Sequence, residues 1–185
     1  MIDAHLHLWD LRRSAYSWIT PEHGPLHTTI TAERAHAELT ACGVDRAVLV
    51  QAEDSEADTA FMLEVAERNP WVEGVVGWVR LDDPATADKQ LGRWLEHPAF
   101  RGVRHLVHDD PRDGFLALPG VRESLRMLAG AGLAFDVPDA WPRHLAAVAE
   151  LAAAIPDLTV VVDHLGKPPV GRPDFAAWRA VLAVV

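Results

Sequence analysis

The sequence predicts an α/β fold whose parallel sheet is of the (β/α)8-barrel type. Three observations support this class. Short β-branched runs alternate with segments of helical period. Strand centres recur roughly every 30 residues after a longer first connection, as in successive βαβ units. Polar side chains collect where nearly every predicted strand ends. No G-x-G-x-x-G follows the first strand, which counts against the open, dinucleotide-binding alternative.

The apolar and β-branched runs indicate six strands. We expect them over Ile2–His5, Arg46–Gln51, Val72–Val79, Gly102–Val107, Ala134–Val137 and Thr159–Asp163. The 185 residues suit one domain, residues 1–185. Since a complete barrel has eight strands, we expect a single barrel domain with about six of its eight βα units, without the C-terminal strands.

The helices between these strands have recognisable ends. Thr31 precedes a helix that Gly43 can end. Ser55 and Asp58 have the spacing of a capping box, and Asp83 precedes a proline at a first helical position. The first connection, residues 8–30, is rich in aromatic residues and proline, and we interpret it as an ordered loop over a barrel mouth.

Composition excludes several classes of partner. The net charge of −10 repels phosphate backbones, so nucleic acid is not expected as a partner. No apolar run approaches the roughly 18 residues that span a bilayer, so no membrane partner is expected. The N-terminus lacks the regions of a signal peptide, and the single Cys42 cannot form an internal disulfide. These features favour a cytoplasmic location.

Two histidines follow the first strand in the pattern His5-Leu6-His7. Residues two apart on a strand point to the same side, so both imidazoles can face one point at the barrel mouth. Two converging imidazoles suit a transition metal. Core histidines also produce this pattern, but its place at a strand end favours contact with a metal or a substrate.

A third histidine, His164, follows the most apolar strand. It can be a third metal ligand or a general acid or base. The structural alternative is a histidine that bonds the backbone at a strand end. Because active sites of barrels lie at the carboxyl ends of their strands, we favour the functional interpretation.

Other strand ends carry candidates for substrate contact. Arg104 can bind a carboxylate or polarise a carbonyl, or it can form a structural ion pair with Asp109 or Asp110. Gln51 is a candidate hydroxyl binder. The aromatic candidates for the pocket wall are Trp9 and Trp78.

Four segments in order resemble a known family: IDAHLHLWD, QAEDSEADTAFMLEVAERNPWVEGVVGWVRL, GVRHLVHDD and VVDHLGKPP. They are similar to the amidohydrolase-related family that includes L-rhamnono- and L-fucono-lactonases. The resemblance runs from residue 2 to the end of the chain. It implies a barrel that opens a lactone ring with water, in which the substrate is a small sugar or carboxylated lactone.

The resemblance also implies roles for particular residues. His5 and His7 belong to the first-strand motif, His164 to the sixth-strand motif, and Arg104 with His105 to a substrate-orienting motif. No bridging ligand appears at strand four and no histidine at strand five, so the resemblance implies one zinc-like divalent ion or none. The family's general base, an aspartate on an eighth strand, has no counterpart before Val185, so we expect impaired catalysis from this chain.

Three hypotheses therefore remain from the sequence. The first is a lactone hydrolase, in which Arg104, His105 or a metal held by His5, His7 and His164 stabilises the oxyanion. The second is a metal-dependent decarboxylase on the same scaffold, since fold does not determine function. The third is an inactive, truncated fragment.

Overall fold

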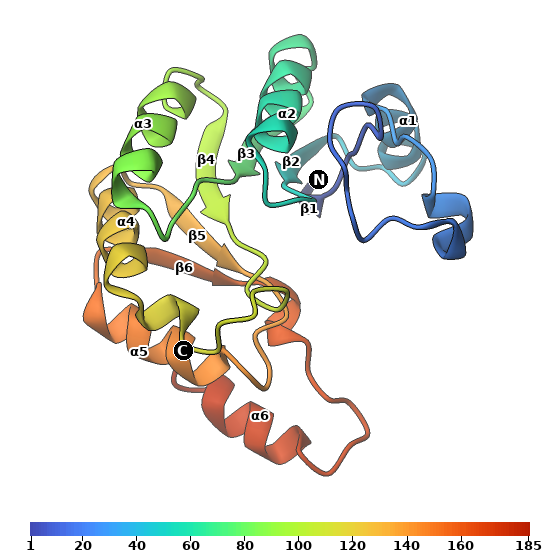
Figure 1. Ribbon diagram of the computed structural model, residues 1–185. Helices are drawn as coiled ribbons and strands as arrows, with labels where there is room; N and C mark the ends of the chain where they lie inside the picture. Colours follow the sequence, from blue (N-terminus) through green and yellow to red (C-terminus); the bar gives the residue numbers. More distant parts are fainter. The chain divides into compact units, whose positions relative to one another are not determined.

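The computed structural model describes residues 1–185, which form a six-stranded sheet in the order β1-β2-β3-β4-β5-β6. The strands are β1 (Ile2–Leu6), β2 (Arg46–Val50), β3 (Val72–Gly77), β4 (Phe100–Arg104), β5 (Ala134–Val137) and β6 (Thr159–Val162). This order, with an α-helix in every connection after the first five strands, confirms the predicted parallel α/β class (Figure 1).

The first three α-helices begin where the sequence indicated, directly after Thr31, Ser55 and Asp83. The α-helices are α1 (Ala32–Ala41), α2 (Glu56–Arg68), α3 (Pro84–Trp94), α4 (Pro119–Gly130), α5 (Leu145–Ala154) and α6 (Phe175–Leu182), with 3-10 turns η1 (Pro21–Leu26), η2 (Phe115–Ala117) and η3 (Asp163–Gly166). The Ser55 hydroxyl accepts from the Asp58 N–H at 3.1 Å, which is the expected cap of α2. The Asp58 carboxylate accepts instead from the Ala52 N–H, so the reciprocal half of a capping box is not formed.

Four strands end earlier than the sequence predicted, β2 and β6 by one residue each and β3 and β4 by more. β3 stops at Gly77, where an added Cβ would lie 2.5 Å from the Thr59 side chain of α2. The next N–H, that of Trp78, donates to the Thr59 hydroxyl at 2.9 Å instead of continuing the strand. β4 begins two residues before the predicted Gly102 and ends at Arg104 rather than Val107, because the following residues form turns.

The chain divides into two compact units. Unit 1 comprises residues 1–78 and 93–101, and unit 2 comprises residues 79–92 and 102–185. In unit 1, β2 pairs in parallel with β1 and β3. The fully buried Ala47, Leu49 and Val75 lie in this part of the sheet, and α2 packs against β3.

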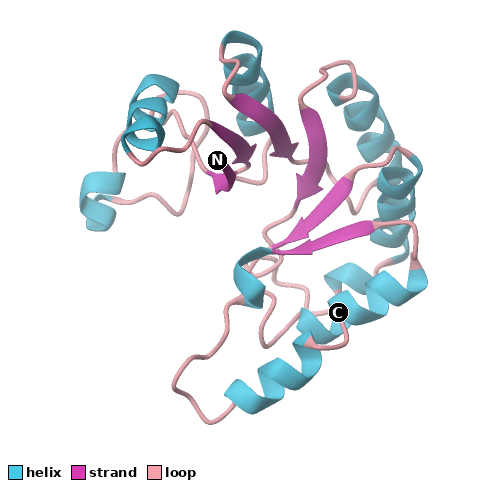
Figure 2. Ribbon diagram, turned by 180° about the vertical axis from the view of Figure 1, so that it is seen from behind, coloured by secondary structure: helices cyan, strands magenta, loops and turns pink.

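Unit 2 is built around β5, which pairs in parallel with β4 and β6. Helix α4 packs against β5 and α5 against β6, and Figure 2 shows the strands and helices of this part of the chain (Figure 2). The apolar stripe of α4, Val121, Leu125 and Leu128, is fully buried, as its helical spacing predicts. None of the helices has the length and apolar character that crossing a bilayer requires.

Candidate active site

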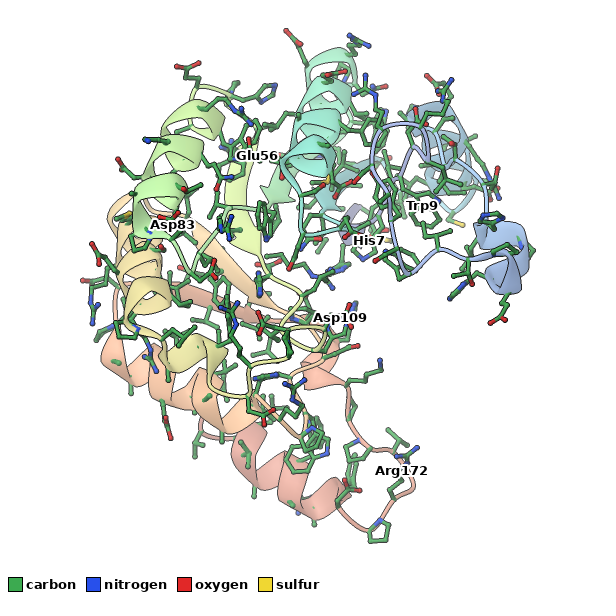
Figure 3. The ribbon with its side chains drawn as sticks, in the orientation of Figure 1. His7, Trp9, Glu56, Asp83, Asp109 and Arg172 are labelled. Carbon is green, nitrogen blue, oxygen red and sulfur yellow. The ribbon has the colours of Figure 1, made fainter.

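In unit 1, His5 and His7 converge at the carboxyl end of β1, as the H-x-H pattern predicted. Their Nε2 atoms are 3.1 Å apart, and the two rings meet edge to face with centroids 4.7 Å apart. Figure 3 labels His7 and Trp9 where β1 passes into the long first connection (Figure 3). Two ring nitrogens of the same type therefore face one point.

An irregularity in β1 contributes to this arrangement. The pairing register with β2 shifts between Asp3 and Leu6, and the His5 N–H donates to the Asp3 carboxylate at 3.0 Å. That N–H is thereby satisfied by a side chain within the irregular stretch. Bulges of this kind re-aim side chains beside active sites, and Asp3 stabilises this one.

A hydrogen bond at the second ring nitrogen of His7 defines the tautomer of this imidazole. Its Nδ1 lies 2.8 Å from the Val50 carbonyl oxygen, which only accepts, so Nδ1 carries the proton and Nε2 presents a lone pair. Two nitrogens 3.1 Å apart could both bind one divalent ion through bonds of about 2.1 Å. The pair therefore fits two ligands of a divalent ion.

The predicted third ligand belongs to the other unit. His164 lies in unit 2, on η3 and exposed. Within either unit no group of three or more His, Cys, Asp or Glu side chains is placed to hold a metal ion. The three-histidine site from His5, His7 and His164 therefore stays a prediction.

The substrate-binding candidates of unit 1 are mostly buried. Gln51 is fully buried and its amide donates to the Asp54 carboxylate at 2.8 Å. Trp9 is buried, and its indole N–H donates to the Thr28 carbonyl at 2.6 Å. Trp78 is only half-buried. These contacts give Gln51 and Trp9 a packing role, and a role for any of the three in substrate binding stays a prediction.

The long first connection is ordered, as its aromatic content predicted. Trp9 and Trp18 pack edge to face at 5.6 Å, and the Trp18 indole donates to the Ala52 carbonyl at 2.8 Å. The hydroxyl of the fully buried Tyr16 donates a hydrogen bond to the Asp58 carboxylate at 2.5 Å. Burial raises the pKa of Asp58 to about 6. This tie between residues 42 apart carried no local signal in the sequence.

In unit 2, Arg104 and Asp163 form a buried ion pair. The Arg104 Nε donates to Asp163 Oδ2 at 2.8 Å. Arg104 is the last residue of β4 and Asp163 directly follows β6. An ion pair was one of the two roles expected for Arg104, and the structure shows one with Asp163, which the sequence did not indicate. Asp110 is instead engaged by Arg112, through two hydrogen bonds of 2.9 and 2.7 Å. A role for Arg104 in substrate binding stays a prediction.

Asp136 on β5 is the register partner of Arg104 and is buried beside this ion pair. Burial raises the pKa of Asp136, the negative charge of Asp163 adds to the rise and Arg104 opposes it, and the pKa is about 7 as a result. With Asp136 ionised, the three groups would carry a buried charge of −1. With Asp136 protonated the cluster is neutral, so this carboxyl holds a proton near neutral pH.

His105 lies just past β4 and is held by stacking. Its ring stacks on Phe115 with centroids 4.1 Å apart, and its Nε2 lies 3.5 Å from Asp110 Oδ2. Burial lowers the pKa of His105 to about 4, against the opposing effect of Asp110. Hydrogen bonds from Arg112 lower the pKa of Asp110 to about 2. His105 is therefore a neutral imidazole at pH 7.

Arg143 anchors the loop after β4, a role that sequence reasoning missed. Its guanidinium donates to the Asp113 carboxylate at 2.8 Å and to the carbonyls of His108 and Asp110 at 3.1 and 2.9 Å. The next residue, His144, is fully buried. Burial lowers the pKa of His144. The only advance signal for Arg143 was its position after a predicted strand.

Comparisons with known proteins agree with the predicted fold. The amidohydrolase family model matches residues 2–185. The L-fucono-1,5-lactonase of Burkholderia ambifaria is 31% identical over 182 residues, covering 98% of this chain and 62% of that protein. The L-fucono-1,5-lactonase of Burkholderia multivorans is 29% identical, over 98% of this chain and 62% of that protein. The chain thus spans less than two thirds of the length of these relatives.

A solved structure gives the same result. An amidohydrolase from Burkholderia multivorans, crystallised with bound zinc, matches with a TM-score of 0.83 and 28% identity, over 99% of this chain and 64% of that one. The six strands thus correspond to part of an amidohydrolase barrel, which confirms the predicted fold class. On the extent of the family match and the agreement of the fold, the chain belongs to the amidohydrolase family.

Proposed function

We propose that the chain is the strand β1 to β6 portion of a hydrolase that opens a lactone ring with water, and that the substrate is a small sugar lactone or a related carboxylated lactone. The observation that carries the proposal is the cluster of Arg104, Asp136 and Asp163 at the carboxyl ends of β4, β5 and β6. The lactonase names of the curated relatives support the substrate class.

The chemistry of lactone opening matches the groups of this cluster. Water adds to the ring carbonyl carbon and releases a proton to solvent, the ring C–O bond breaks, and the ring oxygen takes up a proton as it leaves. We assign that proton to Asp136, because a buried carboxyl with a pKa of about 7 holds it near neutral pH and regains it from water. Asp163 keeps the guanidinium of Arg104 in place, and Arg104 orients the substrate and stabilises the charge that develops on the carbonyl oxygen.

His105 has a second, distinct role in this proposal. As a neutral imidazole it cannot supply a positive charge, but it can donate or accept a hydrogen bond. The stacking on Phe115 fixes its plane, which suits a group that orients a substrate oxygen. Gln51, Trp9 and Trp78 remain our candidates for contacts to the sugar ring.

His5 and His7 fit one divalent, zinc-like ion, and we propose His164 as its third ligand. When bound, such an ion polarises a carbonyl or lowers the pKa of water. The solved relative with bound zinc supports this proposal, which leaves metal-independent hydrolysis as its alternative. One domain over residues 1–185, a cytoplasmic location and a place in carbohydrate metabolism belong to the same proposal.

A substrate panel separates lactone hydrolysis from the decarboxylase alternative. We would assay the purified 185-residue chain, metal-stripped and zinc-loaded, against sugar lactones and against aromatic carboxylic acids. We expect acid release from lactones and no carbon dioxide from the aromatic acids. Turnover of the aromatic acids alone would favour a decarboxylase. No turnover of either class, together with no binding of the hydroxy acid product, would favour an inactive fragment.

A further inference from the structure

Four consecutive residues after β6 adopt the left-handed backbone region. The φ angles are 52° at His164, 56° at Leu165, 69° at Gly166 and 61° at Lys167. Only glycine visits this region routinely, because a Cβ clashes there with the following carbonyl. Three of the four residues carry a Cβ. Such runs persist only where surrounding contacts determine them, and they cluster at functional sites.

The backbone carbonyls of His164, Leu165 and Gly166 each accept a hydrogen bond from a different part of unit 2. The Lys167 N–H donates to the His164 carbonyl at 3.1 Å. The Trp178 indole N–H of α6 donates to the Leu165 carbonyl at 2.8 Å. The Trp141 backbone N–H donates to the Gly166 carbonyl at 2.9 Å. Of these donors, the Trp178 indole is the one side chain, so it is the tie that a substitution can remove.

A second side-chain tie holds the end of the turn. The Lys167 ammonium donates to the Asp139 carboxylate at 2.6 Å, and Asp139 itself has a φ of 46°. Trp178 is buried, whereas Lys167 is largely exposed. Exposed ion pairs contribute little to stability, so the buried indole is the stronger constraint. The loop that carries Arg172 in Figure 3 then connects the turn to α6.

The backbone conformation of this turn sets the direction in which the His164 side chain leaves the main chain. Asp163, one residue earlier, is buried on Arg104, while His164 is exposed. We propose that Trp178 is a positioning residue for His164, acting through the Leu165 carbonyl to hold the left-handed turn that aims the imidazole. The part of this proposal that places His164 in an active site rests on the proposed function. The part that concerns the turn does not.

The chain offers a matched pair of substitutions. Trp178→Phe removes the indole N–H from the Leu165 carbonyl and keeps most of the ring packing. Trp141→Phe removes an indole N–H that donates to Asp174 at 3.2 Å, and leaves the Trp141 backbone N–H on the Gly166 carbonyl. Both variants exchange the same residue types in the same region. Only Trp178→Phe loses a bond to the turn.

Amide hydrogen exchange in the full 185-residue chain reports the turn directly. The Lys167 N–H, which closes the turn, should exchange about fivefold faster in Trp178→Phe, since one hydrogen bond is lost, and at the wild-type rate in Trp141→Phe. The His164 imidazole resonance, identified with His164→Ala, should shift or broaden in the first variant alone. Equal exchange rates and an unmoved imidazole in Trp178→Phe would overturn the proposal.

Glycine at position 165 gives a second test that does not depend on the packing of Trp178. Leu165 is 59% exposed and left-handed, so Leu165→Gly removes a Cβ clash with little loss of packing. Added to Trp178→Phe, it should restore slow exchange of the Lys167 N–H and the wild-type imidazole resonance. Lack of restoration would assign Trp178 a packing role only. These measurements test the role of Trp178 in the turn whether or not the chain hydrolyses a lactone. A lack of hydrolysis would contradict the proposed function alone.

Discussion

Arg104 and Asp163 form a buried ion pair that reaches from the end of β4 to the residue after β6, across the intervening strand β5. Asp136 on β5 lies between the strands that carry these two partners. This arrangement explains why the pKa of Asp136 is raised, since a buried carboxyl next to an already paired carboxylate is stabilised by a proton. The predictions below begin from these three side chains.

Arg104→Lys should separate a catalytic role from a structural one. Lysine keeps the charge opposite Asp163 but loses the planar guanidinium that contacts two oxygens at once. We expect kcat/KM for a lactone to fall about 100-fold, with a loss of only about 1 kcal/mol in the free energy of unfolding. Steady-state kinetics and urea unfolding on the same preparations measure both. Proportionate losses in activity and stability would instead assign Arg104 to the fold, and Arg80→Lys provides the exposed control.

Asp136→Asn should flatten the pH dependence of stability. In the folded chain the pKa of Asp136 is about 7, well above that of an unfolded aspartate, so the folded state binds the extra proton. Ionisation of Asp136 should therefore contribute a loss of stability as pH rises from about 4 to about 7. The variant, which cannot ionise there, should be about 2 kcal/mol more stable than the wild type at pH 8. Urea unfolding at pH 5 and pH 8 tests this, and identical pH slopes for both proteins would contradict it.

His105→Gln should change the pH dependence of stability in the opposite direction to Asp136→Asn. Burial lowers the pKa of His105 to about 4, so protonation favours the unfolded chain. Protonation of His105 should contribute a loss of stability as pH drops from about 6.5 to about 4, and the variant should lack this contribution. Unfolding midpoints at pH 7 and pH 4.5 measure the difference. A variant with the wild-type slope would contradict this prediction, because it would show that His105 has the same pKa in the folded and the unfolded chain.

His5→Ala should weaken metal binding. The variant removes one of two nitrogens that lie 3.1 Å apart, so we expect the affinity for zinc to fall by about 100-fold or more. Zinc titration with elemental analysis measures it, and His36→Ala is the control, because His36 stacks on Trp71 and lies on α1. His164→Ala tests the third ligand. Undiminished zinc binding in His5→Ala would contradict the proposed metal site at His5 and His7.

The sequence predicted those features that depend on local pattern. β5 has its expected bounds, the caps at Thr31 and Ser55 form, and His5 and His7 meet at the end of β1. In each case the relevant atoms are close in the chain, so local spacing predicts that they meet, although it did not predict the irregularity in β1.

The features that the sequence did not predict depend on contacts between distant segments. The partner of Arg104 is 59 residues away, and the partner of Tyr16 is 42 residues away. The left-handed turn at His164 was invisible for a related reason, since the donors that stabilise it come from the loop after β5 and from α6. Local propensity at Leu165 argues against that conformation, and tertiary contacts override it.

The pH profile of lactone opening tests the central claim most directly. We would follow hydrolysis of L-fucono-1,5-lactone by the 185-residue chain between pH 5.5 and pH 8.5, with spontaneous opening subtracted. If Asp136 protonates the leaving ring oxygen, kcat/KM should fall above about pH 7, and Asp136→Asn should lower it at every pH and abolish the falling limb. A profile that stays flat through pH 7, or an Asp136→Asn variant with wild-type turnover, would contradict the account.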